Sequence, residues 1–277
     1  MFKIFNYLRN PIEIAAMSFI VLITLIALIG PLVAPHDPYE ANFHNTFSAP
    51  SSEYIFGTDA AGRDVFSRVL FGAKLTLATT LFIIFIVSSI GIFIGIISAL
   101  SGGIIDNLLM RFTDIWLGFP PLILALGFAA SFGAGMKAAI LALIFTWWPN
   151  YARLSRALII ETKDKEFILS AKAMGVSDLR IIFSHLIPNA FDVLFVQISL
   201  DVAAVILVIS GLSFIGVGAQ IPLAEWGAMI ADGRSAMSKA WWVVFFPGLA
   251  ILLTAISFNL IGDVLRRELD PNLSGNK

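Results

Sequence analysis

The chain has 277 residues, of which 58% are hydrophobic and only 13% charged, and its mean hydropathy is +0.89. Such a composition leaves too little polar surface for a soluble globule and predicts a protein dissolved in the lipid bilayer. The net charge of -1 gives no indication of nucleic-acid binding, and the absence of cysteine excludes disulfides and cysteine-bound metals. No metal-ligand spacing joins the three histidines, His36, His44 and His185.

Six candidate membrane-spanning windows follow one another along the chain. An α-helix needs roughly 20 apolar residues to cross about 30 Å of hydrocarbon. The windows are residues 14–34, 75–100, 115–136, 138 to beyond 151, 191–216 and 240–262. The first is too long for the apolar part of an ordinary secretion signal, so we expect it to stay as an anchor. The sequence therefore predicts an all-α integral membrane protein with six transmembrane helices.

The distribution of basic residues orients these helices. With both termini on the cytoplasmic side, about two thirds of the 18 Lys and Arg fall on that side, as the positive-inside rule requires. The expected parts are a cytoplasmic N-terminus at 1–13, a first transmembrane helix with an extracytoplasmic segment at 14–74, a core of five helices at 75–265 and a cytoplasmic C-terminus at 266–277. The core includes a basic inner loop at 159–187.

The first outer segment, residues 35–74, is long enough to fold over the outer mouth. Thr58 or Asp59 can cap a helix there, and Asp64 and Arg68 are four apart and can pair on its face. We expect these residues to form a structural cap or to contact another protein. A second outer segment, residues 217–239, lies between the last two windows.

The inner loop carries the pattern of two short helices joined by a turn. Phe167, Ile168, Ala171 and Met174 recur at helical spacing and predict one apolar stripe. Gly175 then fits a left-handed helix cap. A second helix is expected from Ser177 and Asp178 to His185, stopping before Pro188. The loop is either an amphipathic or solvated connection, or a lever that docks on another protein.

The fifth window contains a charge near mid-membrane. Asp201 lies about ten residues into the window, where an ionisable group costs at least ~2.5 kcal/mol unless it faces water or a partner. It either lines a translocation path and attracts a cationic group, or it hydrogen-bonds a neighbouring helix. Gly211 and Gly216 further along allow close packing or a break that would suit a gate.

Several blocks of sequence resemble those of a known family. The blocks are Ala171, Gly175 and Ile187-Pro188-Asn189 in the inner loop, residues 56–68, residues 211–218 followed by 225–227, and residues 246–250 followed by 259–263 and 269–271. Together they are similar to ABC importer permeases of the dipeptide, oligopeptide and nickel family, in the C-type permease subunit. Leu169 and Ser170 depart from that family's Glu-Ala-Ala triplet.

The resemblance implies a type I ABC importer permease fold and a permease subunit, not an enzyme. The chain has no Gly-x-x-x-x-Gly-Lys phosphate loop, so ATP and Mg are expected on partner subunits and no cofactor in this chain. The implied partners are a second homologous permease, two ATPase subunits, an extracytoplasmic solute-binding protein and membrane lipid, in the bacterial or archaeal cytoplasmic (inner) membrane. The expected cargo is short peptides, with nickel or a metal chelate as the alternative. A secondary transporter or channel is the rival class.

Residue pattern and resemblance together give three groups of candidate positions. The ATPase coupling loop comprises Glu166, Phe167, Ile168, Ala171, Lys172, Met174 and Gly175. The translocation path and gate comprise Asp201, Gly211, Ser213, Phe214 and Gly216. The outer cap and binding-protein contact comprise Gly57, Thr58, Asp59, Gly62, Arg63, Asp64, Glu225, Trp226 and Gly227.

Overall fold

The computed structural model describes residues 10–269, and its regular structure is helical. The only extended pairing in this part of the chain is an isolated β-bridge between Thr58 and Asp64. The all-α prediction is thus confirmed for the described residues. The Asp270-Pro271 pair of the permease-like blocks lies outside them, as do most of the two predicted cytoplasmic termini.

Four helices are each long and apolar enough to cross a membrane. They are α1 (Pro11–Val33), α2 (Val65–Ser101), the continuous helix Asp178–Ile215 and α10 (Trp242–Leu269). The largest part of the third is α8 (Ile187–Ile215). α2 begins ten residues before the predicted window, so the cations at 68 and 74, assigned to the outer loop from sequence, lie within the helix.

The third predicted window, 115–136, is wrong in its bounds. The chain forms α3 (Gly103–Leu117) and α4 (Pro121–Phe132), which meet at an angle of 81°. The break falls at Gly118 and at Pro120-Pro121, where prolines lack a backbone N–H and push the preceding residue out of the helical region. Counting the bent pair as one span gives five.

The fourth window corresponds to α5 (Met136–Lys163), a helix long enough to span but less apolar than the others. Trp147-Trp148-Pro149-Asn150 interrupts its apolar run, and two arginines follow within six residues. α5 packs closely along α2, since a Cβ on Gly91 would lie 2.4 Å from the carbonyl oxygen of Trp148. Glycine at such a contact lets two helix backbones approach.

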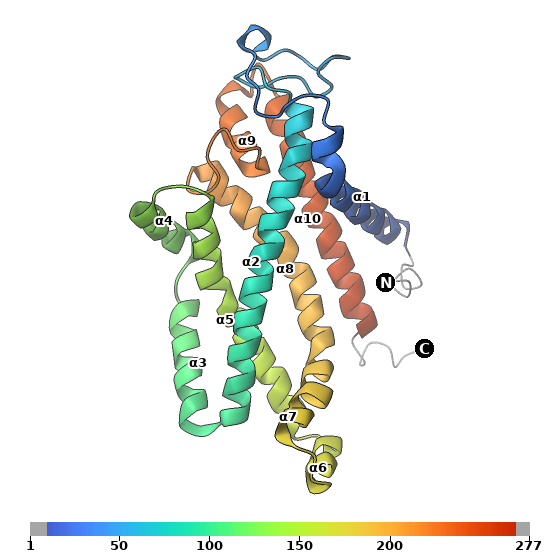
Figure 1. Ribbon diagram of the computed structural model, residues 1–277, viewed down its shortest axis with the longest axis vertical. Coiled ribbons are helices and arrows are strands. Elements are labelled where there is room, and N and C mark those ends of the chain that lie inside the picture. Colours follow the sequence, from blue (N-terminus) through green and yellow to red (C-terminus); the bar gives the residue numbers. More distant parts are fainter. Residues whose placement is uncertain (1–9, 270–277) are drawn as a thin grey trace.

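The helices form one bundle with distinct ends (Figure 1). α2 runs through the middle beside α5, α8 and α10, and α1 lies against α2 and α10. One end carries the loop between α1 and α2, which includes the short η2 (Phe43–Asn45), together with α9 (Trp226–Gly233) and η4 (Arg234–Ala236). The opposite end carries the inner loop.

The start of α1 lies beside the end of α10. A guanidinium nitrogen of Arg267 donates to Glu13 Oε1 at 2.8 Å, and Glu13 is buried. The two ends of the described chain are therefore on the same side of the bundle. α10 also packs closely on α8, where a Cβ on Gly262 would lie 2.5 Å from Leu200 Cδ2.

Candidate functional site

Buried ion pairs tie the outer loop to α9. Asp59 accepts from Arg63 Nε at 2.7 Å and lies 3.4 Å from Arg68 Nε. The same Arg63 side chain reaches Asp232 of α9 at 2.7 Å. All four side chains are largely buried, and their charges balance. A buried ion pair by itself adds little net stability. Moving the loop away from α9, however, would leave a buried charge without its partner, so the group favours the one position of the loop in which all four charges are paired.

Asp64, and not Thr58 or Asp59, caps the N-terminus of α2. Its carboxylate accepts from the backbone N–H of Phe66 at 3.3 Å and of Ser67 at 2.9 Å. The predicted pairing of Asp64 with Arg68 is also wrong: Arg68 turns to Asp59 and to the carbonyl of Pro38. A carboxylate one residue before a helix satisfies N–H groups that have no partner within the helix, which explains why Asp64 is used in this way.

Backbone conformations fix the same loop. Gly57 and Gly62 have φ of 71° and 73°, in the left-handed region that favours glycine. A Cβ on Gly62 would lie 1.7 Å from the carbonyl oxygen of Asn42. Thr58 Oγ1 donates to the carbonyl of Asn45 and accepts from the N–H of Ser48 at 2.8 Å. The loop is therefore held by its own buried polar groups.

The second part of the outer cap begins α9. Glu225 Oε2 accepts from the N–H of Ala228 at 2.9 Å, and its Oε1 accepts from Ser210 Oγ of α8 at 3.2 Å. Trp226 is fully buried and donates to the carbonyl of Val69 at 3.1 Å. A Cβ on Gly227 would lie 2.2 Å from the Ser210 carbonyl oxygen. Glu225 lies in the segment between α8 and α10, outside the spanning helices. Burial raises the pKa of its carboxyl.

All nine predicted cap residues are buried, so none presents a side chain for broad contact with another protein. Exposed neighbours in the outer loop include Tyr39, Phe43 and Ile55. The accessible surface of this end is therefore formed by such exposed residues and not by the nine buried ones.

The charge predicted to lie within the fifth span belongs to a small polar group between α8 and α5. Asp201 is 8% exposed, and its Oδ1 accepts from Gln197 Nε2 at 3.0 Å. Tyr151 and Trp147 of α5 place polar atoms near its carboxyl, but the Tyr151 hydroxyl forms no hydrogen bond within residues 10–269. Asp201 Oδ2 has no hydrogen-bond partner within residues 10–269. The sequence reasoning missed Tyr151 and Trp147, although their spacing of four residues, each with a polar tip, was a usable signal.

The other predicted gate residues lie nearer the outer end of α8. Gly211 faces open space, and Phe214 is exposed with the Arg234 guanidinium 5.8 Å from its ring centre. Ser213 is buried, and its Oγ accepts from the N–H of Ala219 at 3.0 Å. Gly216 ends α8 with φ of 90°. Ten residues separate Asp201 from Gly211, roughly 15 Å of helix, so the structure does not bring these positions into one site.

The inner loop contains the two predicted helices, α6 (Glu166–Ala173) and α7 (Asp178–Ile181). Gly175 has φ of 80°, and its N–H donates to the carbonyl of Lys172 at 2.9 Å while that of Val176 donates to Ala171 at 3.1 Å. These two bonds form the glycine-capped helix end that the sequence predicts.

The predicted stop before Pro188 is wrong. The second helix continues through the π-helical turn η3 (Ile182–Leu186) into α8. Pro188 lies in the first turn of α8, where the missing N–H has little effect because a wider turn precedes it. The inner loop is thus joined to α8 without a break.

The four residues of the predicted apolar stripe differ in exposure, two being buried and two exposed. Ile168 is fully buried and Ala171 is 5% exposed, both in an inner cluster with Ile159 of α5 and Leu194 of α8. Phe167 and Met174 are 45% and 78% exposed. Ile168 and Ala171 therefore fasten the loop to its own chain, and only the exposed pair is free to enter a partner. Glu166 and Lys172 are also exposed.

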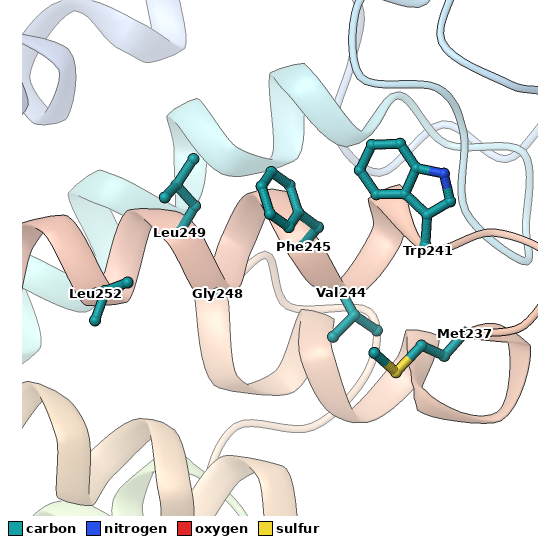
Figure 2. A pocket seen from close by; sticks show the side chains of 7 residues that line it. All are labelled: Met237, Trp241, Val244, Phe245, Gly248, Leu249 and Leu252. Atoms are coloured by element: carbon teal, nitrogen blue, oxygen red, sulfur yellow. The ribbon is translucent and has the colours of Figure 1, made fainter.

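An apolar groove of about 360 Å³ runs along the outer half of α10 (Figure 2). In this view Trp241, Phe245 and Leu249 project to one side, while Met237 and Val244 lie on the other, and Gly248 leaves an open stretch between them. Such a surface suits hydrocarbon or another apolar helix.

Comparison with known proteins gives concordant results. The family model for the binding-protein-dependent transport system inner membrane component matches residues 91–275. A model for the N-terminal TM domain of oligopeptide transport permease C matches residues 5–50. The two matches leave residues 51–90 between them unmatched.

Relatives match over similar lengths. A probable D,D-dipeptide transport system permease protein of Escherichia coli (strain K12) is 40% identical over 268 residues, 97% of this chain and 90% of that protein. A dipeptide transport system permease protein of Alkalihalophilus pseudofirmus is 38% identical, covering 96% and 87%. A glutathione transport system permease protein of Pectobacterium atrosepticum is 37% identical, covering 97% and 89%.

Among solved structures, a chain of the inward-facing MetNI methionine ABC transporter aligns with a TM-score of 0.59. The two are 19% identical, and the alignment covers 73% of this chain and 96% of the other. This likeness concerns the fold, which is that of a type I ABC importer permease.

Proposed function

The chain belongs to the family of binding-protein-dependent transport system inner membrane components, and we propose on that basis that it forms, with a second homologous permease, the path by which short peptides are imported. It is a permease subunit of an ABC importer and not an enzyme. The observation that carries the choice of cargo is the set of relatives, which are named for D,D-dipeptide, dipeptide and glutathione transport and match at least 96% of the chain. These cargoes are all small peptides.

The proposed arrangement has six membrane spans with both termini in the cytoplasm of a bacterium or archaeon. α5 supplies the sixth span, because its 28 residues extend roughly 42 Å, more than the hydrocarbon thickness. The Arg267–Glu13 contact supports placing both termini on one side. The basic inner loop supports assigning that side to the cytoplasm.

Energy enters this arrangement through the inner loop. ATP and Mg bind to two separate ATPase subunits, and the exposed Phe167 and Met174 side chains dock on one of them. Because η3 joins the loop to α8 without a break, a displacement of the loop is passed to α8. Asp201 on that helix, with one unpartnered carboxylate oxygen, is the proposed contact for the cationic amine of a peptide in the path.

The outer end receives the solute-binding protein. Its contact surface comprises exposed residues of the outer loop, held by the buried Asp59–Arg63–Asp232 group. The buried ion pairs are not accessible to a partner, so the exposed residues make the contact and the ion pairs keep the loop in place.

Uptake into proteoliposomes tests the proposal. The chain is reconstituted with its partner permease, both ATPases and the binding protein encoded beside it, and a labelled dipeptide is supplied outside. We expect saturable uptake that needs ATP and that stops when the ATPases are left out. Uptake without ATPases would favour a secondary transporter, and uptake of radioactive nickel but not of peptide would favour the metal alternative.

A further inference from the structure

Asp201 is a buried carboxylate that no cation of the described residues balances. It is 8% exposed and forms no ion pair with a lysine, arginine or histidine of residues 10–269. Gln197 Nε2 donates to its Oδ1 at 3.0 Å, and Oδ2 has no partner there. Gln197 is neutral, so it holds the carboxyl without cancelling its charge. A carboxylate taken out of water without a counter-charge is costly, which indicates that a group from outside the chain balances it.

Tyr151 supplies a second unpartnered oxygen in the same place. Its side chain is fully buried on α5, near the Asp201 carboxyl, and its hydroxyl forms no hydrogen bond with any described residue. Buried polar atoms nearly always have hydrogen-bond partners in folded proteins. Two neighbouring oxygens without partners therefore indicate a place where one further group is bound.

The chemistry of that group follows from the two oxygens. A water molecule donates hydrogen bonds but leaves the carboxylate unbalanced. A primary ammonium carries one positive charge and three N–H donors, so it can contact a carboxylate and a hydroxyl at once. An alkali-metal ion carries the same charge and, as a hard cation, also prefers oxygen ligands. The two share one chemistry, that of a small monovalent cation.

The two oxygens come from the two helices that flank the inner loop. Tyr151 lies on α5, which leads into the loop, and Asp201 lies on α8, which η3 joins to the second helix of the loop. Gln197 and Trp147 border the group and are only half-buried. A cation bound here would bridge α5 and α8, so a displacement of the loop that separates these helices would weaken its binding.

We propose that Tyr151 and Asp201 together bind one small monovalent cation and that, during import, this cation is the ammonium group of the peptide. The assignment of the ammonium rests on the peptide import proposed above, and it adds Tyr151 of α5 to the contact given to Asp201. The free amino group is then the feature that this chain recognises, whatever the side chains of the peptide. A ligand reaches the two oxygens by displacing the neutral side chains of Gln197 and Trp147.

Ligand-observed NMR of the assembled importer, prepared in detergent without its binding protein, measures this binding without a transport step. The probes are alanyl-alanine amide, which has an ammonium and no carboxylate, and its N-acetyl derivative, which has neither charge. We expect the N-acetyl derivative to bind at least roughly tenfold more weakly than the amide, because it lacks the charge-assisted contact. Equal binding of the two probes would overturn the ammonium assignment.

Two variants and a control assign the binding to this chain. Tyr151→Phe removes only an oxygen without a partner in residues 10–269, so it should keep or raise the thermal midpoint yet weaken amide binding about fivefold. Asp201→Asn should weaken binding roughly tenfold or more. Asp192→Asn, which removes an exposed carboxylate of the same helix, should leave it unchanged. Unchanged binding in Tyr151→Phe or in Asp201→Asn would overturn the two-residue site, and Tyr151→Phe decides if Asp201→Asn does not fold.

Sodium NMR separates the two sources of the cation. Line broadening that is present in the wild type and lost in Asp201→Asn, with no binding of the amide, would keep the site and assign it to an alkali ion. Binding of neither cation would overturn the site. ATP-driven uptake that both variants retain at the wild-type rate would remove the site from the path and leave peptide import standing.

Discussion

At the residue scale, the effect of replacing a glycine or a carboxylate at the outer end depends on the atoms packed against it. Gly62 is followed by two charged residues, yet it lies against the Asn42 backbone with no room for a side chain. Glu225 is a charged residue with no exposed surface, held by N–H and hydroxyl donors. Both positions have structural consequences that can be measured in the isolated chain.

Replacement of Gly62 by alanine should destabilise the outer cap strongly. The new Cβ would lie 1.7 Å from the Asn42 carbonyl oxygen, and the backbone there is left-handed, so a loss of about 3 kcal/mol or more is expected. Gly133→Ala is the matched control, because Gly133 also has a left-handed φ of 85° but faces open space, and it should lose only about 1–2 kcal/mol. Thermal unfolding in detergent measures both, and equal losses would contradict the clash.

The stability contributed by Glu225 should fall as pH rises. Burial raises the pKa of its carboxyl above the usual 4.5, so the folded chain binds a proton that the unfolded chain releases over the interval above pH 4.5. The contribution is complete below pH 4.5 and is lost as pH passes through the folded-state pKa. Glu225→Gln cannot ionise, so the stability difference, wild type minus variant, should decrease with rising pH. Melting curves of both proteins across pH check this prediction. A stability difference that increased with rising pH would contradict it.

At the element scale, the inner loop combines a fastening face and an exposed face on one short helix. α6 has eight residues, too few to be stable alone, so its position depends on the buried contacts of Ile168 and Ala171. Spacing alone could not separate these from Phe167 and Met174, because all four are apolar. The direction in which each points depends on where α5 and α8 lie.

Substitutions of a buried and an exposed residue of the inner loop should have different effects. Ile168→Ala should lower the stability of the loop by about 2–4 kcal/mol, because it leaves a cavity in the inner cluster. Met174→Ala should leave stability unchanged but reduce ATP-driven uptake, because the side chain is 78% exposed. Limited proteolysis of the loop and uptake in proteoliposomes measure the two effects. Unchanged uptake with Met174→Ala would remove this residue from the docking surface.

At the scale of the whole molecule, the proposed topology predicts which positions are accessible from each side of the membrane. The chain contains no cysteine, so single cysteines can be introduced without a background. Ser52→Cys in the outer loop should react with a membrane-impermeant maleimide in intact cells. Ser170→Cys in the inner loop and Lys277→Cys at the C-terminus should react only after permeabilisation. Labelling of residue 277 from outside would contradict cytoplasmic termini.

Part of the architecture follows from local sequence alone. Long apolar runs identify α1, α2, α8 and α10 as candidate spans, since helix length against bilayer thickness needs no tertiary information. Gly175 predicts its own helix cap because a left-handed residue is a local requirement. The blocks that resemble permeases likewise indicate the family, which the model matched to residues 91–275 and the relatives that match 96–97% of the chain confirm.

The contacts of the polar groups and the buried faces of the helices depend on the tertiary structure, because partners far apart in sequence compete for the same side chain. The spacing allowed Asp64 to pair with Arg68, but in the folded chain Arg68 contacts Asp59 and Asp64 caps α2. Burial of Ile168 depends on α5 and α8, and the polar group around Asp201 depends on Tyr151, fifty residues earlier. Local pattern determines which residues can form a helix or a cap, and packing determines which face is buried and which partner is reached.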